Sequence, residues 1–576
     1  MVQEKQVDDA ATIRSNNNDD IAVAVTTHAD EAYNIKSEDG IKTSIDDRAS
    51  SSDSGSTTDV ESDELAKNPF LDPKVEEYYR GLYEESKYES YVAFDPHFEW
   101  TPEEEKKVVR KINLRVALTA CVLFVGLQVD RSNLQQGVSD NLLNDIGLTT
   151  DDYNTGNTIF YVCFLAAEVP SQLISKALGP DIFIPIQMIC WSAVAMCQAA
   201  MNGKGSFYAT RALIGALEGG FIADLVLWLS YFFTSKELPV RLSWFWGALS
   251  LCQIATSLLA FGILRMRGIS GMEGWRWLFL LEGIFTCLIG ISGFYLMVPS
   301  AVQTKNWMHP KGWFTPREEK IVVNRILRDD PTKGSMHNRQ GITPYALWKS
   351  LCDYNLWPLY AIGLIAYIGQ FTFTSYFTLM NRQLGFSVFD TNLLTIPQNV
   401  IHIIFLVALT LLSERLNDRA YVCLIAPIYS APLIGIIRWW PGSGVNVWAT
   451  WVLNTLFLGQ PYIHAICVAW VSRNSNGVRG RSISSALFNM FVQVDAIIAN
   501  NIYREDDLPL YHRGNMQLFA ITLTLIPVLL IAKGYYVWMN KRRDKIWNAM
   551  TEEEKHEYRV NTKDEGSKRL DFRFAH

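Results

Sequence analysis

The segment IFIPIQMICWSAVAMCQAAMN, residues 182–202, has no acidic or basic side chain and is apolar over most of its length. An α-helix rises about 1.5 Å per residue, so a segment of this length crosses the ~30 Å hydrocarbon core of a bilayer. Similar segments recur from about residue 114 onward. Their spacing predicts a polytopic α-helical protein embedded in a lipid bilayer, and not a string of soluble domains.

Two groups of six such segments are predicted, one within residues 96–298 and one within residues 354–540. A polar linker at 299–353 separates them, and the sequence Thr-Pro followed by acids precedes each group, at Thr101 and again at Thr315. This weak repeat favours a chain of two related halves. The twelve predicted spans are 114–140, 156–176, 182–202, 206–233, 241–264, 277–298, 356–380, 391–412, 420–438, 446–470, 481–502 and 516–539.

Basic residues mark one side of the predicted bundle. Lys and Arg concentrate in the short loops on that side, a distribution typical of the cytoplasmic face. Both chain ends and the central linker are therefore predicted to be cytoplasmic. The residues that carry this prediction are Lys106, Lys107, Arg110, Lys111, Lys236, Arg241, Arg415, Arg419, Arg473 and Arg479.

The two ends of the chain are polar. Residues 1–95 are rich in Asp, Asn, Ser and Thr and predict a disordered acidic cytoplasmic tail, and residues 541–576 predict a second cytoplasmic tail. The Ser-rich run after Arg48, together with Lys36 and Lys42, predicts contact with kinase and ubiquitin machinery.

Composition also argues against several classes of function. Eight of the nine cysteines fall in apolar segments and the ninth lies just before one, so they predict packing residues and no metal site or disulfide framework. The sequence offers no basic, aromatic-interleaved patch for nucleic acid, no phosphate loop and no nucleophile–base pair. We expect neither an enzyme nor a cofactor.

Ionisable residues inside the spans are the strongest functional signal. Each costs roughly 2.5–3.5 kcal/mol at the centre of a membrane helix, so it must be paired, protonated or exposed to a wet cavity. The first span carries Asp130 and Arg131, and the fourth carries Arg211 and Glu218 on one helix face, with Asp224 pointing elsewhere. Two alternatives stay open: a helix end at the outer surface for the first pair, and a structural ion-pair network for the second group.

Polar side chains also occur in the second half. Asn489, Gln493 and Asn500 form one stripe on the eleventh span, and Asp495 lies on another face of it. Such groups bind ligands about as often as they join helices. Buried histidines and the acids Glu168 and Glu282 are expected to be structural. The other polar residues of the second half are Gln370, Gln398, Asn399, His402 and His464.

An ordered set of motifs over residues ~100–545 resembles the major facilitator superfamily, and within it the fungal allantoate permease family of anion:cation symporters. The motifs are DRSN at 130–133, RALIGALEGG at 211–220, ELPVR at 237–241, GWRWLFLLEG at 274–283, FTPREE at 314–319, SERLNDR at 413–419, WVSRN at 470–474 and NIYREDDLPLYHRGN at 501–515.

The resemblance implies an all-α major facilitator fold of twelve transmembrane helices, with alternating access and a site between two six-helix halves. It implies that Arg131 binds the acid group of a substrate, that Asp130 and Glu218 exchange protons, and that Arg211 pairs within their network. The expected substrate-binding residues are Arg131, Asn133, Arg211, Gln370, Asn399, Asn489 and Gln493. Two departures from the family pattern are a reduced loop at 175–181 and an acid at Asp495.

We therefore expect proton-coupled uptake of a small organic anion, a carboxylate, a vitamin or a sulfur-containing acid such as a sulfonate. Each unit charge costs ~2.3 kcal/mol against 100 mV, and a co-moving proton offsets it. The plasma membrane is the expected location, with the vacuolar or endoplasmic reticulum membrane as alternatives. The rival functions are a non-transporting nutrient sensor of the same fold and a proton-antiport exporter.

Overall fold

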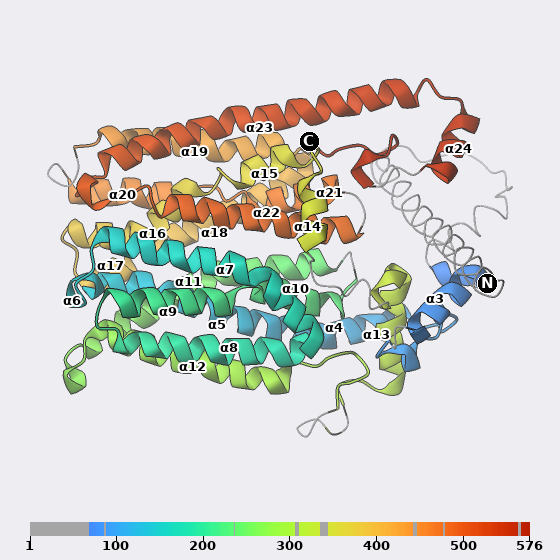
Figure 1. Cartoon of the computed structure of the whole chain (residues 1–576), viewed down its shortest axis with the longest axis horizontal. Coiled ribbons are helices and arrows are strands. Elements are labelled where there is room, and N and C mark those ends of the chain that lie inside the picture. Colours follow the sequence, from blue (N-terminus) through green and yellow to red (C-terminus); the bar gives the residue numbers. More distant parts are fainter. Residues whose placement is uncertain are drawn as a thin grey trace, which may run out of the picture.

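The computed structural model describes residues 68–576 except 86–87, 235–236, 306–309, 311, 335–343, 417, 442–445, 476–477 and 563–565. The predicted kinase and ubiquitin region near Arg48 lies outside the described residues. Secondary structure in the described part is helical, and the helices form two bundles that lie side by side (Figure 1). This arrangement confirms the predicted all-α membrane fold.

The first bundle is the N-terminal half, and each of its predicted spans falls on one helix or on a tandem pair. Its helices are α5 (Leu118–Ser139), α7 (Thr150–Leu178), α8 (Pro180–Cys197), α9 (Lys204–Glu218), α10 (Phe221–Ser230), α11 (Leu238–Ile263) and α12 (Gly274–Leu296).

The second bundle, the C-terminal half, matches the predicted spans in the same way. In the described residues of the whole chain, eight helices are long and apolar enough to cross a membrane, and three shorter helices are also apolar. The helices of this half are α15 (Trp357–Gly363), α16 (Ile368–Gln383), α17 (Val388–Leu393), α18 (Ile396–Leu416), α19 (Ala420–Trp439), α20 (Val447–Leu458), α21 (His464–Asn474), α22 (Val478–Ala499) and α23 (His512–Trp547).

The two halves are joined by hydrogen bonds at one end of the bundle, the end that carries α6 (Leu142–Asp145) and α17 (Figure 1). The Asn154 side-chain amide donates to the Tyr503 carbonyl at 2.6 Å, and the Thr378 hydroxyl donates to the Gln135 carbonyl at 2.8 Å. An aromatic cluster with members from both halves fills the same end. The described interface closes this end of the molecule, which the charge prediction assigns to the outer side.

The fourth predicted span is two helices, contrary to the single helix expected over 206–233. The chain breaks at Gly219 and Gly220, between α9 and α10, and Gly220 has a left-handed φ of 84°. A Cβ atom on Gly219 would lie 2.8 Å from the Phe164 carbonyl oxygen, so only glycine allows this close approach of α7. The prediction that Asp224 points away from Glu218 assumed one continuous helix, so the break removes its basis.

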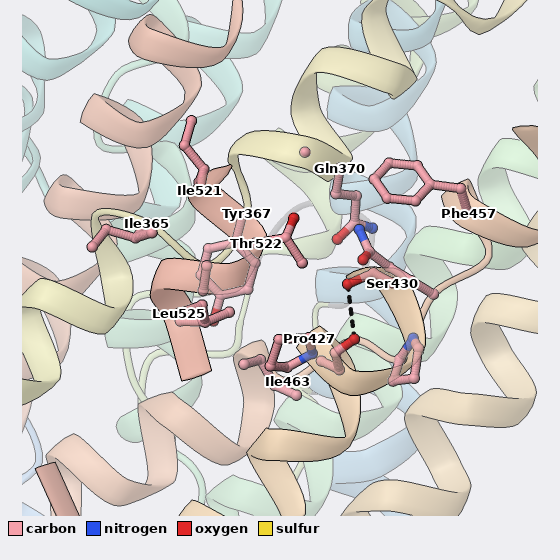
Figure 2. A pocket seen from close by; sticks show the side chains of 15 residues that line it. Ile365, Tyr367, Gln370, Pro427, Ser430, Phe457, Ile463, Ile521, Thr522 and Leu525 are labelled. Atoms are coloured by element: carbon pink, nitrogen blue, oxygen red, sulfur yellow. Dashed lines mark hydrogen bonds between the residues drawn. The ribbon is translucent and has the colours of Figure 1, made fainter. Parts of the chain in front are cut away.

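The C-terminal half has breaks between α15 and α16, between α17 and α18 and between α20 and α21. Residues from the break between α15 and α16 and from the break between α20 and α21 line a small cavity of about 20 Å³, enough for about one water molecule. Figure 2 shows Ile365 and Tyr367 from the first of these two breaks on one side of this cavity, and Ile463 from the other break below it.

Asp495 of α22 stabilises the break between α15 and α16. Its Oδ2 atom accepts the Tyr367 backbone N–H at 2.8 Å, at the residue that caps the N-terminus of α16. The Asp495 side chain is fully buried. A backbone N–H freed by a helix break must find an acceptor inside the membrane, and this requirement explains the acid that departs from the family pattern.

A cap of short helices covers the N-terminal half at the predicted cytoplasmic end. It consists of α3 (Pro73–Glu85), α4 (Pro102–Ile112) and α13 (Pro316–Asp329) (Figure 1). The Thr101 and Thr315 repeats form the predicted capping boxes, and Lys111 of α4 binds Glu318 of α13 at 2.6 Å. The repeat therefore marks two helices that pair with each other.

The prediction of a disordered tail up to residue 95 is wrong for the part that begins at residue 68. Tyr83 of α3 is fully buried, and its hydroxyl donates to the Pro331 carbonyl at 2.5 Å. The Asp95 backbone N–H donates to the Asn324 side chain at 2.8 Å. Tyr79 and Tyr83, one turn apart, supply the apolar face that a composition-based prediction overlooks.

We expect Tyr83→Ala to lower the stability of the purified full-length protein by about 3–5 kcal/mol, because it leaves a cavity under α3. Tyr83→Phe should cost about 1 kcal/mol, since it removes only the hydrogen bond to Pro331. Thermal unfolding measures both. Removal of residues 2–67 is the control and should leave the transition unchanged; an unchanged transition in Tyr83→Ala would show that α3 is not packed.

Asp495→Asn should preserve the fold, because an asparagine Oδ1 can still accept the Tyr367 N–H. Asp495→Leu leaves that N–H without an acceptor and should destabilise the protein by about 1–3 kcal/mol. Thermal unfolding and the amount of protein at the cell surface distinguish the two variants. Equal damage from both would contradict a capping role and indicate that the charge itself is required.

Candidate functional site

The centre of the N-terminal half contains an ion pair between the first and fourth predicted spans. Arg131 of α5 donates from Nε to the Glu218 Oε2 atom of α9 at 2.8 Å. The Glu218 side chain is fully buried, whereas 24 % of the Arg131 side chain is exposed. Glu218 is the last residue of α9, where the helix dipole disfavours a negative charge, so the arginine offsets both burial and dipole.

Asp130 points toward a different partner from its neighbour Arg131. The Trp191 indole of α8 donates from Nε1 to the Asp130 Oδ2 atom at 3.0 Å, and the Asp130 side chain is buried. Asp130 also interacts electrostatically with Glu218 and with the buried Glu282 of α12. The structure thus brings three carboxyl groups together in the interior of one half.

Arg211 approaches the same cluster from α9 but has its own partners. Its guanidinium lies 4.3 Å from the centre of the Phe160 ring and donates to the Asn157 side chain at 3.2 Å. The Arg131 guanidinium lies 6.0 Å from the same Phe160 ring. Arg211 interacts with Glu218 through space, so the two arginines flank one aromatic side chain of α7.

The partners on α7 and α8 are the residues that the sequence analysis missed. Asn157, Phe160 and Phe164 fall on one face of α7, and Phe164 lies 5.1 Å from the Arg131 guanidinium. Their spacing of three and four residues was the available signal. Trp191 had no comparable signal, because its pairing with Asp130 depends on how α8 packs against α5.

Asn133 does not join the ion pair. It is two residues beyond Arg131 on α5, and a helix turns about 200° over two residues, so the two side chains leave opposite faces. Asn133 is buried, and neither atom of its amide has a hydrogen-bond partner within the described protein.

The four predicted residues of the C-terminal half are spread over three helices, and their described contacts are with other residues. Gln370 of α16 lines the cavity of Figure 2, and its amide lies 3.5 Å from the His402 ring of α18. Asn399 donates to the Thr395 carbonyl of its own helix at 3.3 Å. Asn489 interacts with His464, and Gln493 is half-buried on α22. A substrate role for these four stays a prediction.

Comparisons with known proteins agree with this architecture. The Major Facilitator Superfamily model matches residues 120–499. The chain is 44 % identical to an uncharacterized transporter of Saccharomyces cerevisiae, over 92 % of this chain and 98 % of that protein. It is 25 % identical to the major facilitator-type transporter hxnP of Emericella nidulans, over 77 % of this chain and 88 % of that one.

Solved structures show the same fold at low sequence identity. A bacterial homolog of the lysosomal transporter Spinster, inward-facing and occupied, aligns with a TM-score of 0.52 and 13 % identity over 73 % of this chain and 96 % of its own. The xylose transporter XylE of E. coli, partially occluded and inward open, aligns with a TM-score of 0.52 and 13 % identity. The alignment covers 71 % of this chain and 96 % of XylE. These relatives are transporters and not enzymes, and the chain itself belongs to the Major Facilitator Superfamily of multi-pass membrane transporters.

Proposed function

We propose that this transporter is a proton-coupled symporter of the allantoate permease branch, which carries a small organic anion into the cell across the plasma membrane. A carboxylate or a sulfonate is the proposed substrate class. The observation that carries the proposal is the pairing of a partly exposed Arg131 with a fully buried Glu218.

The ion pair with Glu218 uses one nitrogen of the Arg131 guanidinium, Nε. The two terminal nitrogens of a guanidinium lie in one plane and can bind two oxygens of a carboxylate or sulfonate at once. Exposure of part of the Arg131 side chain supports access of an anion to its terminal nitrogens.

Proton coupling follows from the charges of the pair. An anion on Arg131 beside an ionised Glu218 would place two negative groups on one cation in a buried site, which is costly. A proton on Glu218 removes one of them, so anion and proton favour each other's binding. Asp130, which interacts with Glu218, is the proposed second exchange group. The proton also offsets the anion's charge against the membrane potential.

Variants of Arg131 and Glu218 separate binding from coupling. Arg131→Lys keeps the charge but loses the planar donors, so substrate binding should weaken by roughly 1.5–3 kcal/mol, and Arg131→Ala should be worse. Glu218→Gln mimics the protonated acid, so it should still exchange substrate across the membrane but fail to accumulate it. Proteoliposomes loaded with a carboxylate or sulfonate that the wild type transports allow exchange and accumulation to be measured side by side.

Arg542→Lys, at an exposed position near the cytoplasmic end of α23, is the matched control and should behave as wild type. The amount of folded protein is measured first, because a purely structural ion pair predicts that both sets of variants misfold. Normal accumulation by Glu218→Gln, or normal exchange by Arg131→Ala, would require these roles to be withdrawn.

Uptake should increase as the external medium is acidified and should collapse when a protonophore is added, because the proton gradient supplies the driving force. The neutral amide of the same substrate should not be transported, since it cannot bind the Arg131 guanidinium as an anion does. Initial rates in intact cells and in proteoliposomes measure both effects. Uptake that ignores pH and requires sodium would rule out proton coupling, and binding without uptake would favour the nutrient sensor.

A further inference from the structure

The last residues of the chain return to the bundle. After α23 and α24 (Glu552–Asn561), residues 567–576 run back to the predicted cytoplasmic end of the C-terminal half (Figure 1). The sequence analysis treated this region as a plain tail. Its residues 572–576, which we call the strap, form hydrogen bonds with α21, with α23 and with the residue just before α19.

Two asparagines recognise the main chain of the strap. The Asn474 amide of α21 donates to the Ala575 carbonyl at 3.1 Å, and its oxygen accepts the Ala575 N–H at 2.8 Å. The Asn540 amide of α23 makes the same pair of bonds with Phe574, both at 2.8 Å. Each asparagine side chain thus bonds both the N–H and the C=O of one residue, on two consecutive residues of the strap. A neighbouring β-strand binds an extended peptide through the same backbone groups.

Two side chains strengthen this contact: the buried Phe574 ring of the strap and the Arg543 guanidinium of α23. Phe574 is 2 % exposed, and its ring lies 5.2 Å from that of Tyr536. The Arg543 guanidinium of α23 donates to the Phe572 carbonyl at 3.0 Å and to the Ser567 carbonyl at 2.6 Å. The strap therefore buries an aromatic side chain while the backbone groups beside it keep hydrogen-bond partners. This combination is typical of specific peptide binding.

The strap adds hydrogen bonds to three helices that also touch directly at this end, where Lys533 of α23 pairs with Asp418 just before α19 and the Trp470 ring of α21 lies 6.0 Å from the Tyr536 ring of α23. The Arg419 backbone N–H, just before α19, donates to the His576 carbonyl at 3.1 Å, and the Trp470 indole of α21 donates to the Ala575 carbonyl at 2.8 Å. At its other end α21 is separated from α20 by the break at residues 459–463. The short helix α21 therefore lies between a backbone break and the strap.

We propose that the groove formed by Arg419, Trp470, Asn474, Asn540 and Arg543 is a peptide-binding site whose occupant is the chain's own strap, and that this contact fixes α21 against α19. Without the strap, α21 can pivot about the break at 459–463 and separate from α19. The proposal depends on neither the substrate nor the proton coupling, so its test needs no transported solute.

Two native cysteines report on the contact between α21 and α19. Cys467 of α21 and Cys423 of α19 are buried and interact with each other. Cys252 of α11 is buried in the other half and serves as an internal reference. Reaction with N-ethylmaleimide, resolved by mass spectrometry at each site, measures how often each thiol is uncovered.

The first test uses the full-length protein with a protease recognition sequence in place of residues 563–565, cut after purification. In the wild type the released fragment should stay with the transporter in size-exclusion chromatography. The variant Phe574→Asp should lose its fragment, because the charge cannot enter the pocket beside Tyr536. Loss of the fragment from the wild type would overturn the proposed groove.

The second test measures labelling of uncut protein. In Phe574→Asp and in Asn474→Leu, Cys467 should react at least about ten-fold faster than in the wild type, as expected for local opening. Cys252 should be unaffected. Lys568→Ala, an exposed side chain just outside the strap, is the matched control and should change neither rate. Unchanged labelling of Cys467 would overturn the link to α21, and equal acceleration at Cys252 would do the same, because it would show that the whole molecule loosens.

Discussion

The cost of placing an unpaired charge in the interior of a membrane protein governs the centre of this structure. Glu218 is tolerated at the end of α9 because Arg131 reaches it from α5 at 2.8 Å. The pair links the first and fourth predicted spans, and the aromatic face of α7 covers both arginines. The same pairing leaves part of Arg131 accessible, so the constraint that stabilises the bundle also produces its candidate binding site.

A second constraint acts on the backbone. Each helix break inside the membrane frees amide groups that lipid cannot satisfy, so each break needs an internal solution. At Gly219–Gly220 the Gln187 side-chain amide of α8 donates to the Gly219 carbonyl at 2.9 Å, and glycine permits the close packing against α7. At Tyr367 the solution is a carboxyl group from another helix, Asp495. The N-terminal half thus concentrates buried charge, and the C-terminal half concentrates helix breaks.

The sequence predicts those features that depend on composition along one helix. Hydropathy located the spans, and the capping boxes at Thr101 and Thr315 appeared as expected. Hydropathy could not locate the break at Gly220, because two glycines in an apolar run also suit a continuous membrane helix. It could not pair Trp191 with Asp130 either, since that contact depends on the packing register of two helices. The tail prediction failed at Tyr83 because an average over many polar residues hides a short amphipathic helix.

The cap and the strap follow the same division into halves. The cap binds the N-terminal half, where Arg325 of α13 contacts Glu237 at 2.9 Å, just before α11. The strap binds the C-terminal half through α19, α21 and α23. Within the described residues, the hydrogen bonds that cross between the halves lie at the end that carries α6 and α17. At the opposite end each half carries its own brace, the cap on one half and the strap on the other. Rocking of two bodies about a single contact needs this distribution of bonds.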